Sequence, residues 1–272
     1  MNELLTFSAI NNRKWINQLH LKIFALIFMT IDHVSACLLT RILIADGMLD
    51  ASPIPYDWYI EHIQLLTTMK VMRHIGRLAF PLFCYFLVEG FTKTSDLRKY
   101  SINLTIFALI TEVPFDLAFN GKFIDWSYQS VYITLLIGLW GMLGIQIVEE
   151  KITNYTLQDV ARIGVFIIAF GLGALSKSDY NAMGVLVILV MYTLRQYPIV
   201  SFIAGVCVLS FSKSSEAYAF LDVILIALYN HQRGHISKKG KYFFYAYYPA
   251  HLLIIWLIAL NMGLGFISAL HN

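Results

Sequence analysis

The chain has 272 residues, of which 58% are apolar and only 14% are charged, and its formal net charge is +3. Soluble globular chains usually carry about 45–50% apolar and about 25% charged residues. This composition excludes a nucleic-acid-binding module, a disordered protein, a coiled coil and almost any cytosolic enzyme. The sequence therefore predicts an integral membrane protein with a single domain, 1–272.

The first 20 residues are polar or mixed and contain no signal-peptide core, so we expect segment 1–20 to be a cytoplasmic lead. A hydrocarbon layer of about 30 Å needs roughly 20 helical residues, and unpaired backbone groups exclude open strands in lipid. The sequence predicts an all-α polytopic bundle of about nine spans (8–10). The predicted spans lie near 21–44, 75–91, 100–119, 130–149, 159–175, 180–194, 197–212, 217–230 and 242–266.

Basic residues in the predicted loops indicate the orientation. Lys and Arg are in excess on the side that holds the N-terminus, and loop 231–241 is the most basic segment. The positive-inside rule then places the N-terminus inside and the C-terminus outside. Segment 45–74 falls on the outer side. Ile60, Ile63, Leu66 and Val71 recur there at helical spacing, which predicts an amphipathic helix on the outer surface.

The usual soluble-enzyme motifs are missing from the sequence. It contains no Walker loop, GxGxxG fingerprint, HExxH or CxxC pair, so neither a nucleotide fold nor a metal site is predicted. The cysteines Cys37, Cys84 and Cys207 all fall within apolar runs. A disulfide framework is therefore not expected.

Ionisable residues inside predicted spans are the main functional signal. Each costs roughly 2.5–3.5 kcal/mol at the membrane centre, so these residues should face the bundle interior. They are Asp32, His33, Glu89, Glu112, Asp116, Asp222 and His251.

Asp32 and His33 lie midway along the first predicted span. Neighbours on a helix point about 100° apart, so any partner of His33 must come from another helix. An imidazole at this depth can act as a general base or proton relay. The alternative is a hydrogen-bonded pair that only fixes helix packing.

Charges near the outer ends of other spans extend this pattern. Arg73 is interpreted as an interfacial anchor, whereas Arg77 lies one turn deeper and can pair with Asp32. Glu112 and Asp116 flank Pro114 on one helix face, where a proline kink can open a polar cavity or the two acids can serve packing.

Six stretches in matching order resemble the TraX family over nearly the whole chain. They are KIFALIFMTIDH (22–33), RHIGRLAFPLFCYFLVEGFTKT (73–94), TEVPFDL (111–117), SDYNAMG (178–184), YNHQRG (229–234) and YFFYAYYPAHL (242–252). Two departures are visible. The family's usual YNG-K-RG reads YNHQRG here, and its Gln-Asn before the fourth span reads Gln129-Ser130.

The resemblance implies an acetyltransferase in the bacterial cytoplasmic (inner) membrane. It would take the acetyl group from cytosolic acetyl-CoA, and the acceptor would be a pilin, a peptide or an envelope glycan. His33 would deprotonate the acceptor amine or hydroxyl or transiently carry the acetyl group, with Asp32 or Arg77 tuning its charge. The coenzyme phosphates would be held by Asn230, Arg233, Lys238, Lys239 and Lys241, unless these residues anchor the topology or bind lipid headgroups.

The same matching stretches and intramembrane charges define the expected cavity. We expect the acceptor and cavity residues to be Glu89, Glu112, Asp116, Asp179, Tyr180, Tyr248 and His251. Two other functions stay open. A proton-coupled transporter would use Asp32, His33, Glu112 and Asp116 as a relay, although no internal repeat is visible. A membrane assembly partner would use these charges for packing alone.

Overall fold

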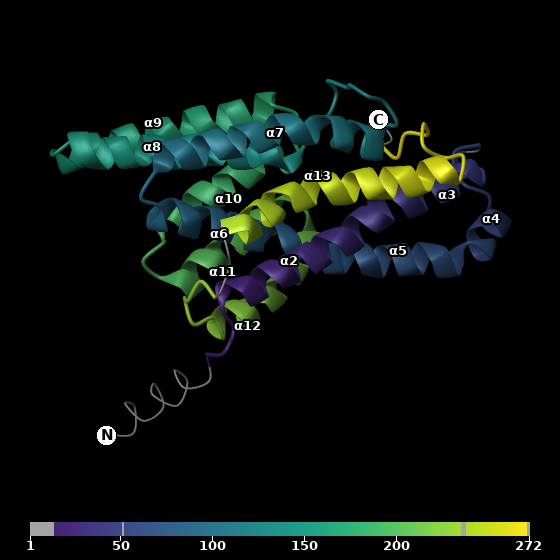
Figure 1. Cartoon of the computed structure of the whole chain (residues 1–272), viewed down its shortest axis with the longest axis horizontal. Coiled ribbons are helices and arrows are strands. Elements are labelled where there is room, and N and C mark those ends of the chain that lie inside the picture. Colours follow the sequence, from purple (N-terminus) through teal and green to yellow (C-terminus); the bar gives the residue numbers. More distant parts are fainter. Residues whose placement is uncertain (1–13, 51, 235–237, 271–272) are drawn as a thin grey trace.

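The computed structural model describes residues 14–50, 52–234 and 238–270 (Figure 1). Within these ranges the fold is all-α, as predicted, and extended segments pair only as isolated bridges. The elements are α2 Gln18–His33, π-helix η1 Val34–Leu39, α3 Thr40–Ala45, α4 Tyr56–Glu61, α5 Ile63–Gly76, α6 Ala79–Lys93, α7 Leu97–Asn120, α8 Val131–Lys151, α9 Tyr155–Leu175, α10 Asn181–Thr193, α11 Pro198–Ser212, 3-10 helix η2 Ser214–Leu221, α12 Asp222–Ala227 and α13 Lys238–Asn261.

Six helical stretches in the described residues are long and apolar enough to cross a membrane. They are Gln18–Ala45, Ile63–Lys93, Leu97–Asn120, Val131–Lys151, Tyr155–Leu175 and Tyr242–Asn261, and α10 and α11 are shorter apolar helices. The chain is therefore a helical membrane protein, whereas the count of nine spans and the orientation stay predictions. The predicted span 217–230 is a 3-10 helix followed by the short α12.

The first membrane helix changes its winding just after His33. Its N-terminus is closed by a capping box, in which the Asn17 side chain accepts from the His20 amide and the His20 ring accepts from the Asn17 amide. The helix then continues as the π-helix η1 and as α3. Single π turns inside α-helices are often found at functional sites. No pattern in the sequence indicates this change of winding.

Segment 45–74, predicted as an outer surface helix, divides into two helices. The first, α4, is short and exposed, and α5 leads into α6 to form one 31-residue stretch, Ile63–Lys93, that is long and apolar enough to cross a membrane. The helix α5 also packs against α2, where Arg73 forms an ion pair with Asp32. The placement of this segment on the outer surface stays a prediction.

The helices differ sharply in how deeply they are buried. The most apolar stretch of α8 is 56% buried inside the protein, whereas that of α9 is 11% buried. In Figure 1, α7, α8 and α9 lie along one side of the molecule and α2 and α5 along the other. The buried side chains of α6, α8 and α10 fill the core, so α9 is an outer helix of the bundle.

Polar contacts close each end of the bundle. At the end where α2 begins, Ile16 forms a bridge with Tyr229. At the other end Arg41 is fully buried and donates to the carbonyl oxygens of Leu117 (2.8 Å) and Ile267 (2.6 Å). Arg41 therefore joins α3, α7 and the C-terminal segment.

Candidate active site

Two histidines from distant parts of the chain meet in the bundle interior. His33 Nδ1 lies 2.7 Å from Nε2 of His251 on α13, and His251 Nδ1 lies 2.9 Å from the Tyr247 carbonyl oxygen. Since a carbonyl only accepts, His251 carries its proton on Nδ1, and Nε2 accepts from His33. His33 Nε2 then keeps its lone pair. The prediction that the partner of His33 comes from another helix is confirmed.

Asp32 lies beside this pair with one of its oxygens unsatisfied. Oδ2 accepts from Arg73 at 2.5 Å, but Oδ1 is buried and has no hydrogen-bond partner. Gly76 allows this close approach, because a Cβ atom at that position would lie 2.1 Å from Oδ1. Asp32 therefore pairs with Arg73, and the predicted Arg77–Asp32 pair does not form.

A small cavity of about 40 Å³ lies against this cluster. Asp32 and His33 line it together with Asp179 and Tyr180. Tyr180 has a positive φ of 61° and its ring stacks on Phe80, with 3.7 Å between the ring centroids. Non-glycine residues with such φ values are uncommon and cluster at functional sites. The cavity thus combines a buried base, a carboxylate oxygen and a strained tyrosine.

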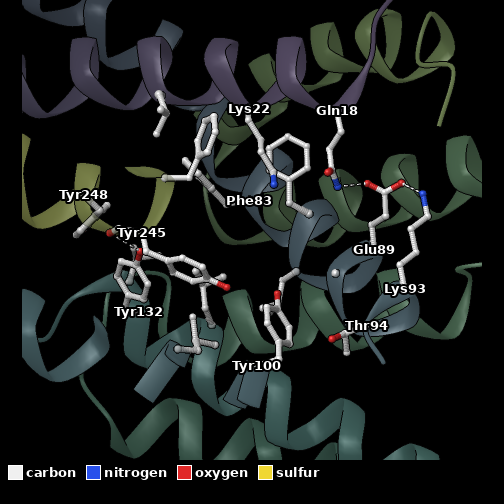
Figure 2. A pocket seen from close by; sticks show the side chains of 18 of the residues that line it. Gln18, Lys22, Phe83, Glu89, Lys93, Thr94, Tyr100, Tyr132, Tyr245 and Tyr248 are labelled. Atoms are coloured by element: carbon white, nitrogen blue, oxygen red, sulfur yellow. Dashed lines mark hydrogen bonds and ion pairs between the residues drawn. The ribbon is translucent and has the colours of Figure 1, made fainter. Parts of the chain in front are cut away.

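A larger cavity of about 470 Å³ adjoins the small one. The residues that line both are Met29, Phe83, Val131 and Tyr248. The larger cavity has a mainly aromatic and aliphatic wall, and Figure 2 shows Tyr132, Tyr245 and Tyr248 on one side of it and the Glu89 cluster on the other. These four side chains therefore form the wall that the two cavities share, and His33 lies on the small-cavity side of it.

The end of the larger cavity near the start of α2 and the end of α6 is cationic. Lys22, Lys93 and Arg233 line it, and among the described lining residues Glu89 is the only acid. The Lys22 ammonium lies over the rings of Phe86 (6.0 Å) and Phe244 (5.4 Å). Three cations against one carboxylate favour an anionic group such as a phosphate at this end.

A family model described as TraX protein matches residues 17–259. The chain belongs to the TraX family. This TraX-family chain is also 22% identical over 257 residues to the probable fimbrial assembly protein FimC, serogroup H1, of Dichelobacter nodosus. That alignment covers 86% of the chain and 92% of FimC. No solved structure matches the chain.

In this TraX-family protein Arg77 pairs with a residue that the sequence analysis did not select. Arg77 donates to Glu216 of η2 at 2.9 Å and lies 3.5 Å from the Tyr180 hydroxyl. Burial raises the pKa of Glu216, and Arg77 opposes that rise. Arg77 lines neither cavity. Its guanidinium contacts the Tyr180 hydroxyl and not the Asp32 carboxylate.

Asp179 is held by the loop that precedes α8. Tyr128 donates to Asp179 Oδ1 at 2.7 Å, and burial together with the Asp179 carboxylate raises the pKa of Tyr128. The Tyr180 amide also donates to that oxygen at 3.1 Å. The Thr134 hydroxyl donates to the Asp179 carbonyl oxygen. These hydrogen bonds fix the position of Asp179 at the wall of the small cavity.

Glu112 and Asp116 do not line either cavity of the TraX-family chain. Glu112 accepts from the Ser130 hydroxyl at 2.6 Å and from the Ser130 amide at the start of α8. Asp116 accepts from the Asp125 amide at 2.8 Å and from the Asn120 side chain. Both acids bond to the loop between α7 and α8, which is the packing role left open for them by the sequence.

The residues expected to hold coenzyme phosphates are only partly brought together. Arg233 lines the larger cavity, whereas Asn230 lies outside it and accepts from the Gln232 amide. The side chains of Lys238, Lys239 and Lys241 lie outside the described residues. Lys22 and Lys93, which the sequence did not mark for this role, also line the larger cavity.

Several residues at the site were not selected from the sequence. Arg73 was interpreted as an anchor, and Glu216 and Tyr132 were not considered. Glu216 lies in a short polar segment with no helical pattern to mark it as buried, yet only 2% of it is exposed. When α5 is joined to the second span, Arg73 lies inside a long apolar stretch. That position could have identified Arg73 as a candidate site residue.

Proposed function

We propose that this chain is a membrane-embedded acetyltransferase. It would move an acetyl group from acetyl-CoA, bound at the cationic end of the larger cavity, to an amine or hydroxyl at the small cavity. The observation that carries this proposal is the junction of the two cavities at Tyr248, with the cations at one end and the free nitrogen of His33 at the other.

The residues present fit the chemical groups of acetyl-CoA. Lys22, Lys93 and Arg233 offer positive charge to the phosphates, and the apolar wall of the larger cavity suits the pantetheine arm. The two polar atoms left without a protein partner near the junction, the Tyr248 hydroxyl and Asp32 Oδ1, are the kind of groups that a bound substrate satisfies.

The proposed reaction balances with these residues alone. His33 Nε2 accepts the proton of the acceptor N–H or O–H as that atom bonds to the acetyl carbon. The bond between the acetyl carbon and sulfur breaks, and the proton passes from His33 to the departing thiolate. The hydrogen bond from His33 Nδ1–H to His251 keeps Nε2 as the nitrogen that takes up and returns the proton.

The acceptor is proposed from the relative's name and from the family resemblance. FimC of D. nodosus is named as a probable fimbrial assembly protein. A pilin-type peptide is therefore the first acceptor to test, with an envelope glycan as the alternative. The bacterial inner membrane is the proposed location, since acetyl-CoA is made in the cytosol.

The test is acetyl transfer by the purified full-length chain in proteoliposomes, with labelled acetyl-CoA and either a pilin-type peptide or an envelope glycan. We expect His33→Ala to lower transfer by about 10²–10⁴-fold, the range for loss of a general base. The matched control is His62→Ala, because His62 contacts Trp58 and Asp46 at the exposed start of α5.

Two results would contradict the proposal. Transfer by His33→Ala within threefold of the unaltered protein would remove His33 from the mechanism. Proton-driven uptake by proteoliposomes that neither bind nor turn over acetyl-CoA would favour a transporter instead.

A further inference from the structure

Tyr248 stands out among the buried tyrosines because its hydroxyl has no hydrogen-bond partner. The side chain is only 5% exposed, and it lines both cavities. A buried hydroxyl that stays unpaired costs about 1–3 kcal/mol, so a group without a partner at a cavity wall indicates a ligand that supplies one.

The ring of Tyr248 is fixed by its neighbours on three sides. It packs edge-on against His33 (5.6 Å between centroids), His251 (5.4 Å) and Tyr132 (5.2 Å). Three edge-on contacts leave the ring little freedom to turn. The hydroxyl is therefore held in place beside the catalytic histidine pair.

Nearby tyrosines use their hydroxyls within the protein. Pro249 lacks an amide hydrogen, which leaves the carbonyl of Tyr245 without its helical donor, and Tyr132 donates to that carbonyl at 3.3 Å. The Tyr247 hydroxyl lies 2.9 Å from the Thr30 hydroxyl. Tyr132 and Tyr247 thus stabilise the packing of α13, whereas the Tyr248 hydroxyl makes no hydrogen bond that would do so.

We propose that the Tyr248 hydroxyl donates a hydrogen bond to the carbonyl oxygen of the acyl thioester and holds the negative charge that develops there. This inference rests on the proposed acetyltransferase function. A thioester that enters past the cations and meets His33 must place its carbonyl at the junction that Tyr248 lines.

The step leaves the proton on Tyr248. As the acceptor atom bonds to the acetyl carbon, the carbonyl electron pair moves to oxygen and the hydrogen bond strengthens. When the carbonyl re-forms, the bond from carbon to sulfur breaks and the hydrogen bond weakens again. A donor that acts mainly in the transition state lowers kcat more than it raises KM.

The test compares Tyr248→Phe with Tyr229→Phe in the full-length chain. Each change removes one buried hydroxyl and keeps the ring, but the Tyr229 hydroxyl donates to Glu89 and Tyr229 lines neither cavity. We expect Tyr248→Phe to lower kcat about 100-fold, the effect of losing one such donor, with KM for acetyl-CoA within threefold and no loss of thermal stability. Tyr229→Phe should lower the melting temperature and change kcat by less than threefold.

A binding measurement separates this inference from the proposed function. S-ethyl coenzyme A keeps the chain length of acetyl-CoA but lacks the carbonyl. Because the hydrogen bond acts mainly in the transition state, the unaltered protein should bind acetyl-CoA only about two- to threefold more tightly than S-ethyl coenzyme A, and Tyr248→Phe should bind the two equally.

The outcomes are distinct. If the unaltered protein transfers acetyl groups and Tyr248→Phe keeps its kcat within threefold, the role of Tyr248 is wrong while the acetyltransferase function stands. If Tyr248→Phe loses activity only together with stability, Tyr248 has a structural role alone. If the unaltered protein neither binds nor turns over acetyl-CoA, the proposed function itself fails.

Discussion

Asp32 and Glu89 are both carboxylates inside predicted spans, but their surroundings differ. Glu89 accepts from Gln18 (2.8 Å), Lys93 (2.6 Å) and Tyr229 (2.7 Å), so both of its oxygens are satisfied (Figure 2). Asp32 pairs with Arg73 through one oxygen and leaves the other unpartnered at the small cavity.

This difference separates packing from function among the intramembrane charges. A charge whose hydrogen bonds are all made within the protein is stabilised by the fold and contributes to the fold. A buried charged group that has an atom without a hydrogen-bond partner costs stability. Such groups cluster at sites that bind ligands or carry out reactions. Glu89 therefore joins α2, α6 and the segment after α12, whereas Asp32 faces the small cavity.

The largest expected effect is on the satisfied carboxylate. Glu89→Ala removes the acceptor for three donors and leaves the buried Gln18 amide and Tyr229 hydroxyl without it. We expect the free energy of unfolding to fall by about 3–5 kcal/mol, measured by thermal or denaturant unfolding in detergent. Glu150→Ala, at an exposed acid of α8, should change it by less than about 0.5 kcal/mol. Equal losses for both variants would contradict the comparison.

The second prediction concerns the open carboxylate. Asp32→Asn keeps one oxygen for Arg73 but replaces the free acceptor at the cavity with an N–H₂ donor. We expect acetyl transfer to fall about 100-fold, which corresponds to about 2.7 kcal/mol, with little change in the melting temperature. Asp159→Asn on the outer helix α9 serves as the control. A stability loss in Asp32→Asn as large as that of Glu89→Ala would place both acids in the packing class.

The third prediction tests the close approach of α5 to Asp32. Gly76→Ala places a methyl group where Asp32 Oδ1 now lies, so the carboxylate must move. We expect transfer to fall about tenfold, or about 1.4 kcal/mol, measured as kcat at saturating acetyl-CoA. Gly164→Ala on α9 is the matched control, because an added Cβ there meets nothing within 4 Å. That control should gain about 0.5–1 kcal/mol of stability from its better helix propensity.

The smallest expected effect is at Glu112. Glu112→Ala removes the acceptor at the start of α8, and loss of such a cap costs about 1 kcal/mol of stability. Because Glu112 lines neither cavity, we expect acetyl transfer to stay within twofold of the unaltered protein. Loss of transport or transfer in this variant without loss of stability would favour the proton-relay alternative.

The sequence shows which ionisable residues lie within apolar stretches. It does not show which residue each of them contacts or where its side chain points. The sequence selected Asp32, His33, Glu89 and His251 because ionisable groups are costly in an apolar run. It misjudged Arg73 and Arg77, since a shift of one helical turn exchanges their partners. It also missed the continuity of α5 with α6, because an amphipathic helix that packs on a neighbour has the same pattern as one that lies on lipid.

The sequence by itself determined that this is an all-helical membrane protein of the TraX family. A chain so apolar must satisfy its backbone groups within helices. The six family-like stretches and their order are visible in the sequence alone. Only the tertiary structure decided that His33 meets His251, 218 positions away, and that Tyr248 has a free hydroxyl at the junction of two cavities. These depend on how α13 packs against α2 and η1, and a hydrogen bond that is not made leaves no trace in the sequence.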